Sequence, residues 1–199
     1  MARKTDGQER KRRPRFAGAG SADAASAMAP AGAGAMGALR AERVRSFAPV
    51  ARADARILVV GSMPGEESLR RGEYYGHPRN AFWRIAGALW GFDARLPYGE
   101  RLESLKRAGV ALWDVLGSCR REGSLDADIE DAVPNDLPGL LAGCPGVRVI
   151  GCNGGTAHAA LRRFFPELEE RAVRLPSTSP AAAMWTFDQK LAMWAQALR

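Results

Sequence analysis

Short apolar runs alternate with longer amphipathic segments along the chain from about residue 55. Four runs are short and bounded by glycine, proline or charged residues, which is typical of strands covered on both faces. They are residues 57–60, 110–116, 147–151 and 172–175. Between and after them, apolar residues recur at helical spacing over residues 80–90, 99–108 and 156–165 and from about 187, with a shorter helix from about 135. This alternation predicts a three-layer α/β/α sandwich around a mostly parallel four-stranded sheet.

Two further features of the pattern refine this prediction. Residues 117–134 show neither a helical nor a strand period, and we expect them to be irregular. Thr186 and Gln189 have the spacing of a capping box, which predicts the start of the last helix.

The first 40 residues differ in composition from the rest of the chain. Residues 1–15 hold seven basic and two acidic residues, so removing them lowers the net charge from +7 to +2. Sixteen of the residues from Ala17 to Leu39 are Ala or Gly, with no periodic large apolar side chain. Because such a segment cannot offset the entropy of ordering, we expect residues 1–40 to be a disordered tail and residues 41–199 to be one domain. A basic arm favours a polyanionic partner, although a solubilising or targeting role fits the composition too.

The cysteines and the hydropathy exclude several classes of protein. Cys119, Cys144 and Cys152 include no C-x-x-C pair, which argues against a disulfide framework, a zinc site or an iron–sulfur cluster. We therefore expect no metal and a reducing, cytoplasmic location. No apolar run is long enough to cross a membrane, so we expect no membrane association.

The candidate site begins where the first strand ends. In RILVVGSMPGEESLRRGEYYGHPRNAFWRIAGALW, residues 56–90, a buried strand leads into a turn that Gly61, Pro64 and Gly65 constrain. The carboxyl end of a strand is the usual ligand position in an open α/β sheet. An aromatic and polar loop, YYGHPRN at residues 74–80, follows closely. Aromatic faces next to an amide and an imidazole are suited to holding a flat heterocycle.

Three segments together resemble the uracil-DNA glycosylase superfamily, and within it the DNA-deoxyinosine, or hypoxanthine-DNA, glycosylase branch. They are GSMPG at residues 61–65, YYGHPRNAFW at residues 74–83 and LPSTSPA at residues 175–181. The first resembles the loop that activates water in the superfamily, and the last resembles the loop that presses into the duplex during base flipping. The resemblance covers roughly residues 47–199 and implies a uracil-DNA glycosylase-like fold.

The resemblance also exposes a departure from the superfamily pattern. Met63 stands where relatives carry the Asn or Asp that activates water, and a thioether cannot do this. Asn80 is the best replacement, because its amide can accept from a water and donate to a carbonyl, and the deoxyinosine branch uses an Asn in this segment. Capping of the following helix is an alternative role for Asn80, and the two roles are compatible.

Other residues are expected to bind the base or the DNA. Tyr75 occupies the position of the aromatic residue found between the motif halves of relatives, and we expect its face to stack on the flipped base, although Tyr74 remains possible. Ser62, Met63, Gly65 and His77 complete the expected substrate-binding set. Ser177, Thr178 and Ser179 lie in a proline-flanked turn that suits phosphate contacts. The roles of Asp114 and Asp126 stay open between chemistry and structure.

The resemblance, taken with these residues, implies a monofunctional enzyme that hydrolyses the N-glycosidic bond of deoxyinosine in double-stranded DNA containing deaminated bases. No cofactor is implied, the site motifs hold no lysine for Schiff-base chemistry, and we expect a monomer. A uracil or mismatch-specific glycosylase of the same fold is the nearest alternative. A non-catalytic nucleic-acid-binding module, in which Met63 marks lost catalysis, is the alternative from another class.

Overall fold

A computed structural model describes residues 43–198 and contains a parallel four-stranded sheet at its centre. The strands are β2 (Ile57–Gly61), β3 (Val110–Asp114), β6 (Val149–Asn153) and β7 (Ala172–Leu175). They lie in the order β3-β2-β6-β7, and each neighbouring pair is parallel. The carboxyl ends of all four strands therefore meet at one edge of the sheet.

The side chains of this sheet alternate between two hydrophobic cores. In β2, Leu58 and Val60 belong to one buried cluster, whereas Val59 belongs to the other. The strand is buried on both faces because successive side chains point to opposite sides of a sheet. This is why the run ILVV is apolar at every position rather than at alternate ones.

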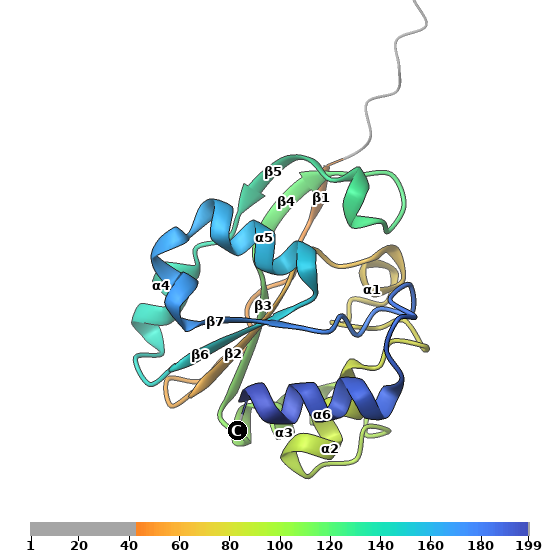
Figure 1. The fold of residues 1–199 in the computed structure, drawn as a ribbon, viewed down its shortest axis with the longest axis vertical. Coiled ribbons are helices and arrows are strands. Elements are labelled where there is room, and N and C mark those ends of the chain that lie inside the picture. Colours follow the sequence, from red (N-terminus) through yellow and green to blue (C-terminus); the bar gives the residue numbers. More distant parts are fainter. Residues whose placement is uncertain (1–42, 199) are drawn as a thin grey trace, which may run out of the picture. The chain divides into compact units, whose positions relative to one another are not determined.

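Helices cover both faces, which confirms the predicted three-layer sandwich (Figure 1). One face carries α2 (Phe82–Trp90), α3 (Tyr98–Arg107) and α6 (Phe187–Leu198), and the other carries α4 (Leu137–Gly143) and α5 (Gly155–Phe164). A short helix, α1 (Glu66–Arg71), follows β2, and two 3₁₀ segments span Asp126–Asp128 and Pro166–Arg171. The helix α1 was not expected from the sequence.

Helix α6 closes the face opposite α5. Its capping box forms as predicted, because Thr186 N donates to Gln189 Oε1 at 3.0 Å and Gln189 N donates to Thr186 Oγ1 at 3.3 Å. Trp194 is fully buried edge-on against Phe82 of α2, and its Nε1 donates to Pro176 O at 3.0 Å. This helix thereby supports the loop that follows β7.

A second sheet corrects two of the predictions. The expected strand over residues 110–116 breaks at Val115, and the chain leaves the parallel sheet to form β4 (Leu116–Arg120). Strand β4 pairs antiparallel with β1 (Arg43–Arg45) and with β5 (Glu130–Pro134). The prediction that residues 117–134 are irregular is therefore wrong, because this stretch contains most of β4 and all of β5. The expected strand over 147–151 begins two residues later, at Val149.

The predicted tail, residues 1–40, lies outside the described residues. Within residues 43–198 no helix is both long and apolar enough to span a membrane. The three cysteines are buried and unpaired, which agrees with the absence of a disulfide framework among the described residues.

Candidate active site

A cavity of about 390 Å³ opens at the carboxyl edge of the parallel sheet. Each strand contributes to its lining: Gly61 ends β2, Asp114 ends β3, Asn153 ends β6 and Ser177 follows β7. This is where an open α/β sheet places its ligands, because the loops that follow parallel strands converge there. The volume suits a small flat molecule.

All nine residues that the sequence singled out line this one cavity. They are Ser62, Met63, Gly65, Tyr75, His77, Asn80, Ser177, Thr178 and Ser179. Three segments separated by up to about a hundred residues are thus brought together. Their roles in binding and catalysis remain predictions.

Asn80 lies at the start of α2 with half of its amide engaged. Its Oδ1 accepts a hydrogen bond from Phe82 N at 2.9 Å, so Asn80 caps the first N–H of α2 from one position before the N-cap residue Ala81, which itself makes no side-chain cap. The same oxygen keeps a second lone pair, and Nδ2 has no hydrogen-bond partner within residues 43–198. Capping fixes the orientation of the side chain and leaves both kinds of hydrogen-bonding capacity available to the cavity.

The two adjacent tyrosines differ in their freedom to meet a ligand. Tyr74 is almost fully buried, and its hydroxyl lies 3.3 Å from both Phe47 O and Ala48 O. Tyr75 stacks on Phe82 with ring centroids 4.0 Å apart. Its hydroxyl is buried without a hydrogen-bond partner among the described residues. Burial, followed by the negative charge of Asp114, raises the pKa of this phenol against the opposing effect of the nearby Asn153 side chain, so the phenol stays protonated.

Asp114 is a buried carboxyl at the floor of the cavity. It is 3% exposed, and its Oδ2 accepts from Ser46 Oγ at 2.7 Å. The pKa of Asp114 is raised to about 7, chiefly by burial and to a smaller extent by nearby Asp126, while the Ser46 hydrogen bond and Arg121 oppose the shift. A titratable group with such a pKa in a cleft is typical of a functional site.

The turn after β2 is held in place by the loop that follows β4. Arg121 Nη2 donates to Pro64 O at 2.5 Å, and Glu66 N donates to Ser124 Oγ at 2.9 Å. Ser62 Oγ donates to Asp126 Oδ1 at 2.8 Å. Two of the bonds anchor the GSMPG turn and the third anchors the start of α1, so Asp126 has at least a positioning role.

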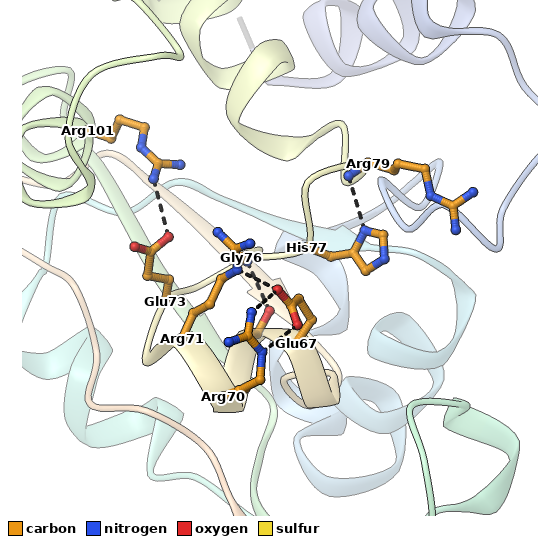
Figure 2. A network of polar contacts seen from close by, with 9 residues as sticks. Glu67, Arg70, Arg71, Glu73, Gly76, His77, Arg79 and Arg101 are labelled. Carbon is orange, nitrogen blue, oxygen red and sulfur yellow. Dashed lines mark hydrogen bonds and ion pairs between the residues drawn. The ribbon is translucent and has the colours of Figure 1, made fainter.

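Helix α1, helix α3 and the loop between α1 and α2 carry several arginines (Figure 2). Arg70 and Arg71 both bind Glu67, and Arg101 binds Glu73. His77 Nδ1 accepts from Arg79 N at 3.1 Å. A neutral His77 therefore carries its proton on Nε2, where it can serve as a donor.

Thr178 differs from its two serine neighbours. It is 1% exposed, and its N and Oγ1 both bond to the Asn153 amide, at 2.9 and 2.8 Å. Ala81 N also donates to Thr178 O at 3.0 Å. These contacts tie the loop after β7 to β6 and to α2. Burial gives the Thr178 side chain no access to a phosphate in this structure, so Ser177 and Ser179 remain the candidates for that contact.

The sequence reasoning missed the turn after β6. Asn153, Gly154, Gly155 and Thr156 line the cavity at the amino end of α5. Gly154 has φ of 104° and lies where a Cβ would come within 3.0 Å of Ser177 Cβ, so glycine is required there. The sequence did carry a signal for this turn, because N-G-G follows an apolar strand directly. Ligands bind at the carboxyl ends of such strands, and this argument, which identified GSMPG, would have identified the N-G-G turn too. Within residues 43–198 no cluster of metal-ligating side chains forms.

Comparisons with known proteins agree with this architecture. The family model described as Uracil DNA glycosylase superfamily matches residues 48–199. Two proteins named hypoxanthine DNA glycosylase, from Methanosarcina barkeri and Methanosarcina acetivorans, are each 40% identical. The matches span 55% and 57% of this chain and 70% and 72% of those proteins.

A solved structure is similar over a larger part of the chain. It is the solution NMR structure of a candidate uracil DNA glycosylase from Methanosarcina acetivorans, with a TM-score of 0.66 and 33% identity, and it covers 79% of this chain and 100% of its own. The family match covers most of the chain and includes every segment that lines the cavity. The chain therefore belongs to the uracil DNA glycosylase superfamily.

Proposed function

We propose that this protein is a monofunctional DNA glycosylase that removes hypoxanthine from deoxyinosine in double-stranded DNA and leaves an abasic site. The observation that carries the proposal is the single cavity in which GSMPG, YYGHPRN and PSTSP meet. The relatives named hypoxanthine DNA glycosylase support the choice of base. Superfamily membership supports the coarser statement that the substrate is a damaged base in DNA.

The reaction replaces the bond between C1′ and the base nitrogen with a bond from C1′ to a water oxygen. The electron pair of the broken bond leaves with the base, and the attacking water loses a proton to solvent. The transition state has the character of an oxocarbenium ion, so placing the water and stabilising the charge matter more than a strong base. In our proposal the free lone pair and the Nδ2 of Asn80 hold the water or the base.

The target nucleotide must leave the base stack before it can enter the cavity. Flipping costs about a few kcal/mol, and less for a mispaired base. Ser177 and Ser179, half-buried in the loop after β7, are proposed to contact the backbone phosphates that flank the flipped nucleotide. His77 and the exposed Arg79 would add donors at the entrance.

The lining of the cavity argues for simple hydrolysis. No lysine is among its residues, whereas Schiff-base lyase chemistry requires an amine at the reacting carbon. The buried Lys190 donates to Ala182 O at 2.8 Å and lies outside the lining. We therefore propose that strand cleavage does not follow base removal.

Labelled duplexes test the proposal directly. Duplexes with a single inosine, uracil, xanthine or no lesion are incubated with the protein, and abasic sites are then cleaved with alkali. Breaks mainly at inosine are expected, and only after alkali. Breaks mainly at uracil would instead indicate a uracil glycosylase, and binding without any breaks would indicate a non-catalytic module.

A further inference from the structure

Three carboxyl groups line the cavity, and they differ in the charge that they can present to a ligand. They belong to Glu67, Asp114 and Asp126. Glu67 is paired with Arg70 and Arg71, so its charge is already balanced (Figure 2). The pKa of Asp114 is raised to about 7, chiefly by burial, so this carboxyl is protonated for a large part of the time at neutral pH. The third carboxyl, that of Asp126, is therefore the one whose negative charge is available to the cavity.

The Asp126 side chain is held in place with one oxygen free. Its Oδ1 accepts from Ser62 Oγ at 2.8 Å, whereas its Oδ2 makes no hydrogen bond to the described residues. It forms no ion pair within residues 43–198. Arg121, which precedes it in the same loop, donates to Pro64 O and lies outside the lining of the cavity. A fixed carboxylate with a free oxygen is suited to stabilising a developing positive charge.

The hydroxyl that holds Asp126 belongs to a rigid part of the chain. Ser62 is 8% exposed, and its O accepts from Leu116 N at 3.1 Å. The neighbouring Gly61 O accepts from Val115 N at 2.8 Å. These bonds fix the turn after β2 to the start of β4. Asp126 is thereby placed before a substrate binds, and a preorganised charge needs no rearrangement during the reaction.

The difference in burial places Asp126 nearer the mouth of the cavity than Asp114. Asp114 is 3% exposed, whereas Asp126 is partly exposed in the loop between β4 and β5. A flipped nucleotide enters a pocket base first, because its sugar and phosphates stay joined to the strand. When the base reaches the floor, its sugar therefore lies at the level of Ser62 and Asp126.

We infer that Asp126 stabilises the positive charge that develops on C1′ and the ring oxygen of the deoxyribose as the base departs. This inference rests on the proposed function and adds a catalytic residue to it. The bond between C1′ and the base nitrogen breaks, and its electron pair leaves with the base. A water oxygen then bonds to C1′, and the water proton goes to solvent. Asp126 faces the oxocarbenium ion between these events and acts through its charge, without taking a proton.

A charge that faces the sugar acts in the same way on every base. Replacing Asp126 should therefore slow the excision of each base that the protein removes by the same factor and leave the base preference unchanged. A loss confined to one base would place Asp126 against the base instead and would overturn the inference.

Substitutions separate the charge of Asp126 from its hydrogen bond. Asp126→Asn keeps an oxygen that can accept from Ser62 and removes the charge, so single-turnover excision of hypoxanthine should fall by at least about 10²-fold. Asp126→Ala should fall at least as far. Ser62→Ala removes the bond and keeps the charge, so it should lose less than about tenfold. The control is Asp128→Asn, an exposed residue of the same 3₁₀ segment, which should excise at the wild-type rate.

Uncleavable duplexes test the contact with the sugar by binding rather than by rate. One holds a pyrrolidine in which a protonated nitrogen replaces C1′, and the matched duplex holds a neutral tetrahydrofuran at the same position. Wild type should bind the pyrrolidine duplex at least about tenfold more tightly, because its ammonium pairs with the carboxylate. Asp126→Asn should lose this preference, and Asp128→Asn should keep it. Fluorescence anisotropy measures all six affinities.

The outcomes separate this inference from the proposed function. Wild type that excises hypoxanthine but binds the two analogues equally would overturn the inference and leave the glycosylase proposal standing. Excision by Asp126→Asn within about threefold of wild type would do the same, and a slow Asp126→Ala beside it would assign Asp126 to the positioning of Ser62. Wild type without excision of any base would overturn the proposed function and the inference with it. Circular dichroism and thermal melting establish that each variant is folded.

Discussion

Asn80 shows how one side chain can have a structural and a chemical role. Its Oδ1 caps α2, and its Nδ2 is free to meet a ligand. Capping restrains the side chain before the substrate arrives, and preorganised polar groups of this kind carry much of the catalytic effect in enzymes. The same contact means that a simple truncation of Asn80 removes two functions at once.

We therefore predict different results for two substitutions at Asn80. Asn80→Ala should lower single-turnover excision by at least about 10²-fold and should destabilise the protein by about 1 kcal/mol through loss of the cap. Asn80→Ser keeps a capping oxygen, so the variant should be as stable as wild type. It lacks the amide, so its single-turnover excision should still be slow. Rate and thermal stability are measured on both variants. A near-normal rate in Asn80→Ser would assign Asn80 to capping alone.

The buried Asp114 carboxyl should make stability depend on pH. Its pKa is raised to about 7 in the folded protein from 3.8, chiefly by burial, so the folded state holds the proton more tightly than the unfolded state. The contribution of Asp114 to stability is then greatest below about pH 4, falls as pH rises, and reaches its lowest value above about pH 7. A functional group retained despite such a penalty is typical of an active site.

Asp114→Asn removes this titration, and we predict that the variant gains stability relative to wild type as pH rises. Between pH 5 and pH 8 the difference in free energy of unfolding should shift in favour of the variant by about 3 kcal/mol. Urea denaturation of both proteins at the two pH values measures it, and other groups cancel because both proteins share them. If the two proteins differed in free energy of unfolding by the same amount at both pH values, the pKa of Asp114 would not be raised in the folded protein.

At the scale of single residues, the sequence predicted which residues line the cavity better than it predicted their contacts. The composition of GSMPG and YYGHPRN was enough to identify cavity residues, because turn glycines and clustered polar aromatics are local signals. The fixation of Thr178 by Asn153 depends on the pairing of β6 with β7 and could not be deduced from either segment alone.

At the scale of elements, buried parallel strands were predicted well and the antiparallel sheet was missed. Strands β4 and β5 are short, their pairing is irregular, and Asp131 in β5 has φ of 48°. Their residues therefore show no regular alternation. The break at Val115 is also non-local, because Val115 N donates to Gly61 O at 2.8 Å and Leu116 N donates to Ser62 O at 3.1 Å.

The Asn153–Thr178 contact connects two elements of the site, and we predict that it controls DNA binding through the loop after β7. Asn153→Ala leaves the buried Thr178 N and Oγ1 unpaired, which should free the loop and weaken lesion-duplex binding by about tenfold or more. Thr178→Val removes only the side-chain bond and should have a smaller effect. Fluorescence anisotropy with an inosine duplex measures both. If both variants bound the inosine duplex as tightly as wild type, the Asn153–Thr178 contact would not be needed to hold the loop for DNA binding.

At the scale of the whole molecule, the charge is distributed unevenly along the chain. Residues 1–15 contribute five of the seven net positive charges. Several arginines near the cavity are already paired with acidic residues, as Arg70 and Arg71 are with Glu67. Electrostatic attraction that is not specific to the lesion should therefore come largely from the amino-terminal segment, and recognition of the base from the cavity.

Deletion of residues 1–40 tests this division. Each basic group that neutralises a phosphate releases a counterion, so losing several such groups should weaken DNA binding at low salt and flatten its dependence on salt. The single-turnover rate at saturating protein should stay within about twofold, because the cavity residues begin after residue 60. Binding to inosine and undamaged duplexes is titrated from 50 to 300 mM salt for both proteins. If the truncated protein lost its preference for the inosine duplex, the amino-terminal segment would have to take part in recognising the lesion.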